Sequence, residues 1–422
     1  MNLTHYQTEF EKIMNREYFS KEVHPIRKDA FSKFLDTGFP TQKWEDWRFT
    51  NLSAITKKNF KISDVQDAPK EKLDLSEFEM DDVADIIFYN GHFQRNISTI
   101  PKGIQLLTGL EYLETKNWQF NHPANSPFDL LNTAFMDSGL SLVISPNTVI
   151  EKPIRILFIS SGKENLMVSP IVYFDLGKSA SATFIEHHLG DAQAFFQNSS
   201  THIALSQNAQ LDHIRIQSNS QEFINMANLN IEQGVDSQYS FFQFAEGGKL
   251  SRLNIRADLK GEGANCNLSG LALSTNSQHL DHHIITDHKV AHCTSSQNFK
   301  SVLQDSSKGV FVGKTIVREN AQKTDSTQNN KNLLLSNNTL MNSNPQLEIY
   351  ADDVKCVHGS TTGALDDNAL FYLRSRGLDL MESKALLVNG FANELLDKIK
   401  QESVRAFITN QFENWLRKNT TG

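Results

Sequence analysis

The middle of the chain repeats one kind of turn, in Leu176-Gly-Lys-Ser-Ala180, Leu205-Ser-Gln-Asn-Ala209, Ile231-Glu-Gln-Gly-Val235 and Leu259-Lys-Gly-Glu-Gly-Ala264. The leading residues are 29, 26 and 28 positions apart. Each turn follows a short apolar or alternating run of the kind that forms a strand. This spacing favours one coil of a stacked β-solenoid per repeat. An antiparallel sandwich, with a turn about every 8 to 12 residues, remains an alternative because this region also has turns at that spacing.

The N-terminal side of this strand-rich region has the spacing of helices. Over residues 1–50, apolar side chains recur at helical spacing in two stripes, and Gly38 ends the second. Residues 57–82 are rich in charged side chains and are interpreted as a linker. The pair Asn90-Gly91 then predicts a tight β-hairpin.

The C-terminal side becomes helical again after residue 358. Asp366 can cap a helix that ends at Gly377, and Asp379 with Glu382 predicts a capping box at the start of the next helix. We therefore divide the chain into an N-terminal helical region with linker and hairpin, a strand-rich core and a C-terminal helical domain, over residues 1–139, 140–358 and 359–422.

Composition excludes several classes of function. The formal net charge is −8, and no Lys/Arg run resembles a nucleic-acid groove, so we expect neither nucleic acid nor a membrane as a partner. No stretch approaches the roughly 18 apolar residues of a membrane helix, and the start lacks a basic segment followed by an apolar one. The three cysteines, Cys266, Cys293 and Cys356, are too few for a disulfide framework. We expect a soluble protein of the reducing cytoplasm.

Cys356 and His358 form the best metal-ligand pair in the sequence. Two positions apart on a strand, they would point the same way, with about 6 to 7 Å between them. A thiolate beside an imidazole suits iron, zinc or iron–sulfur chemistry. The alternative is a buried strand cysteine next to a histidine in a turn.

A second group of potential ligands is dense but does not match a known metal-binding motif. It comprises His279, His282, His283, His288, His292 and Cys293. No pair has the helical His-x-x-x-His geometry within a Glu-bearing zinc-protease motif, and the neighbours His282 and His283 would face opposite sides of a strand. Hydrogen-bonded histidines are the favoured interpretation, and the role of the group is left open.

The segment around Cys356 resembles a known family. Tyr350-Ala-Asp-Asp-Val-Lys-Cys-Val-His-Gly359, followed by Gly363-Ala-Leu-Asp366 and Leu370-Phe-Tyr-Leu-Arg-Ser-Arg-Gly377, is similar to the SufB/SufD family of SUF-system iron–sulfur cluster assembly proteins, and to its SufD branch. Upstream motifs resemble the same family in the same order, among them Glu45-Asp-Trp-Arg48, Asn125-Ser-Pro-Phe128, Lys300-Ser-Val-Leu303 and Gly313-Lys314. The resemblance covers most of the chain.

The resemblance implies a right-handed parallel β-helix core flanked by helical domains. It also implies a non-catalytic scaffold that pairs with the paralogue SufB and docks the ABC-type ATPase SufC. Iron or a nascent iron–sulfur cluster would bind transiently at the SufB interface, with His358 as a ligand and Cys356 as a second candidate. Nothing would be tightly bound to the isolated chain, and a homodimer without partners is left open. Residues expected to contact the ATPase are Asp366, Phe371, Leu373, Arg374, Leu387, Phe391 and Leu395.

Two alternatives stay in view. A SufB-like principal scaffold is disfavoured because the N-terminal half has no Cys-x-x-Cys, and because Cys-x-His stands where the paralogue carries a Glu-His-Glu type segment. A β-helix carbohydrate-active enzyme would need carboxylates in a groove, and the expected strands offer few.

Overall fold

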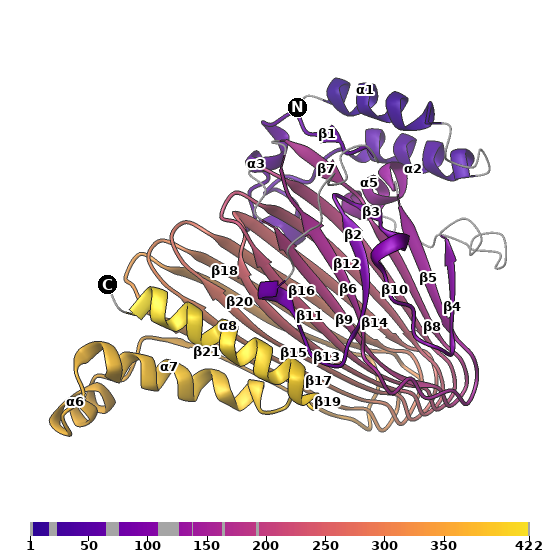
Figure 1. The fold of residues 1–422 in the computed structure, drawn as a ribbon. Coiled ribbons are helices and arrows are strands. Elements are labelled where there is room, and N and C mark those ends of the chain that lie inside the picture. The colour runs from indigo at the N-terminus through magenta and orange to yellow at the C-terminus, as the bar shows by residue number, and fades with distance from the viewer. Residues whose placement is uncertain are drawn as a thin grey trace.

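The computed structural model describes residues 3–16, 23–64, 76–108, 126–136, 138–162, 165–190 and 194–420. Strands form a long parallel β-solenoid, and helices lie at both termini (Figure 1). The mainly-β fold class predicted from the sequence is confirmed, because the paired strands of successive coils are parallel from β6 (Ile154–Ser160) to β21 (Lys355–Gly363).

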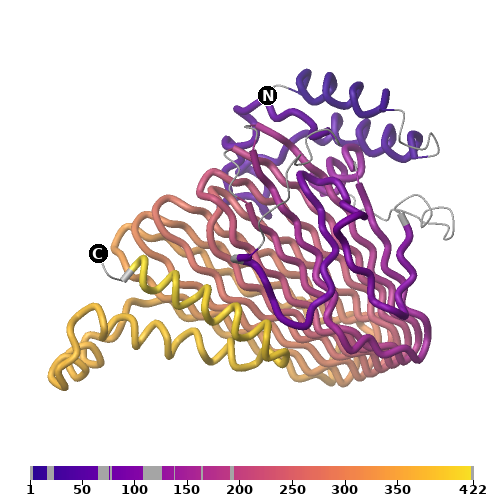
Figure 2. The backbone as a smooth tube through the Cα atoms, viewed as in Figure 1, coloured from indigo at the N-terminus to yellow at the C-terminus, as the bar shows by residue number. Residues whose placement is uncertain are grey.

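Successive strands of the solenoid alternate between two sheets. Sheet A contains β1 (Lys61–Ile62), β4 (Ile104–Thr108), β5 (Gly139–Ile144), β7 (Leu166–Val168), β8 (Ile171–Leu176), β10 (Phe196–Leu205), β12 (Ile224–Gln233), β14 (Leu250–Leu259), β16 (His279–His288), β18 (Lys308–Val317) and β20 (Leu340–Ile349). Sheet B contains β2 (Ala84–Tyr89), β3 (His92–Phe93), β6, β9 (Ser181–Gly190), β11 (Gln210–Asn219), β13 (Gln238–Gly247), β15 (Asn265–Ser274), β17 (Thr294–Leu303), β19 (Asp325–Leu334) and β21. Figure 2 shows the coils side by side from the N-terminal to the C-terminal end.

The register of the ladders corrects one of the predicted repeats. Leu176 pairs with Leu205, Leu205 with Gln233, and Gln233 with Leu259. Gln233, and not Ile231, is therefore equivalent to the leading residues of the other turns. The sequence comparison matched an apolar residue, whereas the position is held by a buried glutamine whose Nε2 donates to the Asn265 carbonyl at 2.9 Å.

Each of these turns uses a residue in the left-handed region of backbone space. The φ angles of Ser179, Asn208 and Asp236 are 55°, 57° and 54°, and Gly263 has a φ of 72° in the fourth turn. Asn and Asp adopt this conformation more readily than most other residues, and Gly adopts it without strain. The repeated turn therefore has a conformational cause as well as a spacing.

The apolar core lies between the two sheets and is densest in the first coils. Phe174 and Phe184 stack there with ring centroids 4.7 Å apart, and both are fully buried. In the later coils the interior becomes polar, with buried Gln297, Gln328 and Asn330 on sheet B. Side chains of one sheet hydrogen-bond to the other here, because a buried amide needs a partner.

The N-terminal region forms helices, as predicted, and they pack on the first coils. They are α1 (Leu3–Met14), α2 (His24–Thr37), α3 (Ser53–Thr56) and α5 (Pro127–Phe135), with short 3₁₀ turns at Glu45–Trp47, Ser76–Phe78 and Arg95–Ile97. Gly38 ends α2 with a φ of 68°. The Trp47 ring is buried under the Arg252 guanidinium, 3.7 Å away. Trp47 is therefore a packing residue.

Helices at the C-terminus carry the predicted caps. They are α6 (Asp367–Ser375), α7 (Leu380–Leu396) and α8 (Glu402–Thr420). The Asp366 carboxylate accepts from the Asn368 N–H, and Asp379 with Glu382 forms a complete capping box. In Figure 1, α7 and α8 lie along one face of the solenoid. This is the outer face of sheet B, where their apolar residues form one buried cluster with those of the strands.

The three regions divided from the sequence share strands of the same two sheets. Strands β1, β2 and β4 of the N-terminal region join the two sheets, and β21 continues to Gly363, past residue 358. The Asn90-Gly91 hairpin is confirmed, since β2 and β3 pair antiparallel around it. Much of the predicted linker, residues 65–75, lies outside the described residues.

Candidate functional site

The C-terminal end of the solenoid is open. Among the described residues, β20 and β21 are the last strands of sheets A and B, and neither has a neighbour on its outer side. None of the residues in β20 or β21 is buried, whereas β19, one coil earlier, buries Ser326, Gln328 and Asn330. The end of the solenoid therefore exposes its interior.

Cys356 and His358 both face this interior. They pair in register with Ser326 and Gln328, whose side chains point inward, and neighbours in a parallel ladder share a face. Ser360, two positions further on, confirms the direction, because its hydroxyl lies 2.7 Å from the Ser343 hydroxyl of β20, across the open end. The two predicted ligands thus share a face, as expected from their spacing.

His358 is exposed although it does not lie at the end of its strand. The predicted core ended at residue 358, yet β21 continues to Gly363 and Cys356 is its second residue. His358 is therefore the more central of the two in the strand. Its exposure follows from the absence of a further coil among the described residues, because an inward-facing side chain in any earlier coil is covered by the next one.

Cys356 is half-buried beside a small apolar cluster of Val317, Ala321 and Ala351. Burial raises the pKa of the Cys356 thiol, and the nearby Asp325 carboxylate raises that pKa further. The thiol is therefore mostly protonated at neutral pH. A metal ion would have to displace that proton to bind sulfur.

A chain of buried hydroxyls leads down from Cys356. Ser326, its ladder neighbour, lies 2.9 Å from the Ser295 hydroxyl, which in turn lies 2.8 Å from Nε2 of His288. Burial lowers the pKa of His288 to about 4, so this imidazole is neutral at pH 7. The two serine hydroxyls and Nε2 of His288 thus have hydrogen-bond partners inside the polar interior.

The structure disperses the second group of potential ligands. His282 faces the interior and hydrogen-bonds Gln243, whereas His283 faces outward and pairs with Asp281. His279 lies 3.1 Å from the Thr50 hydroxyl of the N-terminal region. Within the described part of the chain, no three His, Cys, Asp or Glu side chains form a metal-binding group. The favoured interpretation of hydrogen-bonded histidines is confirmed for these three.

Residues predicted to contact the ATPase fall into two groups. Phe371 has 76% of its surface exposed on α6, beside Tyr372 with 57%. Asp366 and Arg374 are also exposed, and Leu373 and Leu387 are partly exposed.

Leu395 and Phe391 instead face the solenoid. Leu395 is fully buried in the cluster between α7, α8 and sheet B, so the prediction that it meets a partner is wrong. Helix α7 turns this side towards the strands because the Lys300 ammonium donates to the Phe391 carbonyl at 2.7 Å and to Glu394 at 2.6 Å. The half-buried Phe391 ring lies 4.7 Å from that ammonium.

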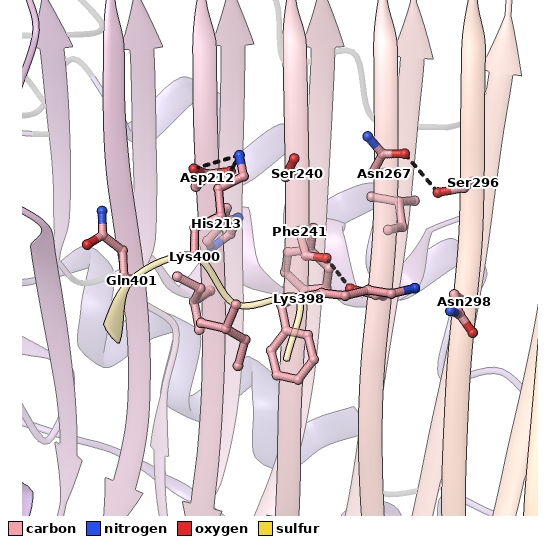
Figure 3. A pocket seen from close by; sticks show the side chains of 15 residues that line it. Asp212, His213, Ser240, Phe241, Asn267, Ser296, Asn298, Lys398, Lys400 and Gln401 are labelled. Carbon is pink, nitrogen blue, oxygen red and sulfur yellow. Dashed lines mark hydrogen bonds and ion pairs between the residues drawn. The ribbon is translucent and has the colours of Figure 1, made fainter. Parts of the chain in front are cut away.

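A groove of about 220 Å³ lies on the outer face of sheet B, beside the connection from α7 to α8 (Figure 3). Among the described residues that line it, Asp212 is the one carboxylate. The Lys400 ammonium donates to both oxygens of that carboxylate, at 2.9 and 3.1 Å. A glycosidase needs two carboxylates on either side of the scissile bond. The groove therefore gives no support to the carbohydrate-active alternative.

Comparison with known proteins identifies the family of the chain. The SufBD protein N-terminal region matches residues 2–156, and the SufBD core domain of SUF system FeS cluster assembly matches residues 158–391. The second match runs from the end of β6 through β21 and α6 and covers most of α7. The chain belongs to the SufBD family.

Several SufBD family members and relatives are similar over nearly their whole length. An iron–sulfur cluster assembly SufBD family protein of Synechocystis sp. is 31% identical over 87% of this chain and 85% of its own. The iron–sulfur cluster assembly protein SufD of Escherichia coli is 29% identical over 90% of both chains. The chloroplastic protein ABCI7 of Arabidopsis thaliana is 27% identical over 94% of this chain and 87% of its own. The chain is thus a SufD-like iron–sulfur cluster assembly protein.

Sequence reasoning missed residues that surround His358. Gln328 lies beneath it in the ladder, and Leu347 occupies the facing position of sheet A. The signal that could have found them is the repeat itself, because residues about 30 positions before an open-end residue become its neighbours in the adjacent coil.

Proposed function

We propose that this chain is a SufD-type scaffold subunit, without catalysis of its own, that pairs with a SufB-type paralogue and docks a SufC-type ATPase during iron–sulfur cluster assembly. Iron or the nascent cluster is the cargo of this complex. His358 supplies one ligand from this chain, and Cys356 is a second candidate. No cofactor is bound tightly by the isolated chain.

The open end of the solenoid is the observation that carries this proposal. Two parallel strand edges end here side by side, and such edges pair readily with another chain. Leu340, Tyr350 and Val357 add exposed apolar side chains to the same end. A paralogue built on the same coils would cover these edges and enclose His358, as the next coil would.

A neutral imidazole suits transient binding of ferrous iron. Its nitrogen is a ligand of intermediate softness, and one ligand from each side of an interface would hold an intermediate weakly enough to pass it on. The thiol of Cys356 contributes once its proton is displaced.

The exposed face of α6 is the proposed contact for the ATPase. Phe371 and Tyr372 place two aromatic rings in solvent, and exposed aromatic clusters are typical of interaction sites. Asp366, Leu373 and Arg374 lie on α6 or next to it, and Leu387 is partly exposed on α7. Phe391 is half-buried against sheet B, and Leu395 is excluded because it is buried.

Three free cysteines, two of them buried, agree with a reducing compartment, and the cytoplasm is the proposed location. None of the described helices is long and apolar enough to cross a membrane.

Co-expression with SufB- and SufC-type partners tests the scaffold role. The wild-type chain should co-purify with both and carry iron and acid-labile sulfide under anaerobic conditions. Replacement of His358 by Ala should leave the complex intact and reduce its iron. His292→Asn is the matched control, since it removes an exposed imidazole from a turn of an earlier coil whose φ of 61° Asn tolerates. Normal cluster content in His358→Ala would refute the ligand role.

Docking of the ATPase is best tested by substitution. Deleting all residues after Gly363 would uncover the apolar face of sheet B, because α7 and α8 cover it. Phe371→Ser with Tyr372→Ser should abolish capture of the ATPase without changing the melting temperature. Ile97→Ser is the control, since it removes another exposed apolar side chain, far along the sequence from α6. Undiminished capture by the α6 variant would contradict the assignment.

A further inference from the structure

Two buried glutamines repeat one arrangement in successive coils near the open end. Gln297 and Gln328 are ladder neighbours in sheet B, and each is 1% exposed. The amide nitrogen of Gln297 donates to the Thr286 hydroxyl at 3.1 Å, and that of Gln328 donates to the Thr315 hydroxyl at 2.7 Å. Thr286 and Thr315 are ladder neighbours in sheet A. Each glutamine therefore spans the interior to an equivalent threonine.

A backbone carbonyl fixes which way each amide points. Nε2 of Gln297 lies 3.5 Å from the Lys314 carbonyl oxygen, and Nε2 of Gln328 lies 3.4 Å from the Gln346 carbonyl oxygen. A carbonyl oxygen only accepts, so the amide end that faces it must be the NH₂ group. The other end of each amide, Oε1, is buried and accepts no hydrogen bond from the described residues. A buried acceptor without a donor costs roughly 1 to 3 kcal/mol.

The third coil replaces both members of this pair. His358 follows Gln328 in the ladder of sheet B, and Leu347 follows Thr315 in the ladder of sheet A. Leu347 has no hydroxyl, so the equivalent facing position offers the imidazole no hydrogen-bond partner. Gln328, on the adjacent strand about 5 Å away, carries an acceptor that lacks a donor.

We propose that Gln328 is the positioning residue for His358: a rotation of the exposed imidazole toward its ladder neighbour gives the unpaired Oε1 a donor, one ring N–H of His358. The inference rests on the proposed function only in taking His358 as an iron ligand. A neutral imidazole carries one N–H. Holding that proton on the nitrogen that faces Gln328 leaves the lone pair of the other nitrogen directed to the open end, where the cargo binds.

This arrangement follows the general chemistry of histidine ligands. A partner on the far nitrogen fixes the tautomer and the ring orientation, and its loss typically lowers metal affinity about 10- to 100-fold. Thr315 and the Gln346 carbonyl hold the amide of Gln328 in turn. The ligand would thus be oriented before a partner arrives.

Tautomer measurements on the metal-free full chain test the contact directly. In protein labelled with ¹⁵N-histidine, the ring signals of His358 are identified by their loss in His358→Ala. One tautomer should dominate by about tenfold in the wild type, a difference of about 1.4 kcal/mol. Gln328→Met should give comparable amounts of both. Thr315→Val, which releases the amide but keeps its oxygen, should give an intermediate ratio and serves if Gln328→Met does not fold.

Gln297→Met is the matched control. It removes the same amide one coil deeper, where the next ladder neighbour is Gln328 and not the histidine. Both Met variants should lower the melting temperature to a similar extent, and only Gln328→Met should change the tautomer. The affinity of the co-purified complex for added ferrous iron should fall about tenfold in Gln328→Met alone.

The outcomes separate this inference from the proposed function. An unchanged tautomer ratio in both Gln328→Met and Thr315→Val, or an equal change in Gln297→Met, overturns the positioning role. Mixed tautomers in Gln328→Met support it. If His358→Ala also keeps its iron, the positioning contact stands and the ligand role fails.

Discussion

The two ends of the solenoid are built from the same kind of coil but differ in how their last strands are covered. At the N-terminal end, β3 and β4 add antiparallel to β2 and β5, and Ile86 and Phe88 of β2 are fully buried in the apolar interior. At the C-terminal end, β20 and β21 finish both sheets with 49% of Leu340 and 61% of Val357 exposed. A repeat fold needs a cap at each end. One cap is supplied within the chain, and we infer that a partner supplies the other.

The two ends should differ most in the stability lost when an inward-facing side chain is truncated to alanine. Phe174→Ala removes a fully buried ring near the closed end and should cost about 3 to 5 kcal/mol. Leu347→Ala, on the partly exposed inner face of β20, should cost less than about 1.5 kcal/mol in the isolated chain, because little buried volume is lost. Urea denaturation of the isolated chain measures both. Equal losses would mean that the open end is as well packed as the closed one.

Low pH should destabilise the polar interior of the later coils. Burial lowers the pKa of His282 to about 4, below its usual 6.5, so the unfolded chain binds more protons between these values. Stability is therefore lost as the pH falls through 6.5, and this histidine accounts for about 2 kcal/mol of the loss at pH 5. His282→Gln keeps a donor for Gln243 and should lose that much less between pH 7.5 and 5 in urea denaturation. Equal losses in both proteins would contradict this assignment.

The open edge of β21 should carry the pairing with the paralogue. The Lys355 N–H donates to the Thr324 carbonyl, and alternate residues of a parallel strand donate to the same neighbour. Thr361 thus donates towards β19, whereas Ser360 donates to the open side. Ser360→Pro should weaken association with the paralogue at least tenfold, about 1.4 kcal/mol, with little change in fold.

Thr361→Pro is the control for this edge, since it removes a ladder bond inside the chain and should lower the melting temperature of the isolated protein. Calorimetry of the isolated variants and titration with the paralogue separate the two effects. Tight binding by Ser360→Pro would show that the partner does not pair with this edge.

The smallest expected change in stability comes from replacing the proposed ligand His358. His358→Ala removes an exposed side chain, so the free energy of unfolding should change by less than about 1 kcal/mol while the complex loses iron. Thermal denaturation and iron analysis of the same preparation measure both. A large fall in melting temperature would favour a structural role for this histidine.

Local patterns in the sequence were sufficient for the strands, the helices and their caps. Asp366, Asp379 with Glu382, and Asn90-Gly91 act on neighbours a few residues away, and the structure confirms each. The spacing of Cys356 and His358 likewise fixed their common face, because side chains alternate along any strand. Such features need no knowledge of distant contacts.

Tertiary structure alone decided which side chains are covered. Gln233 replaces Ile231 in the repeat because the ladder, and not apolar similarity, sets the register. Leu395 is buried because apolar side chains of sheet B, distant in sequence, pack against α7. His358 is exposed because β21 is the last strand of its sheet among the described residues. Burial depends on which segment lies on top, and that segment comes from elsewhere in the chain or from a partner.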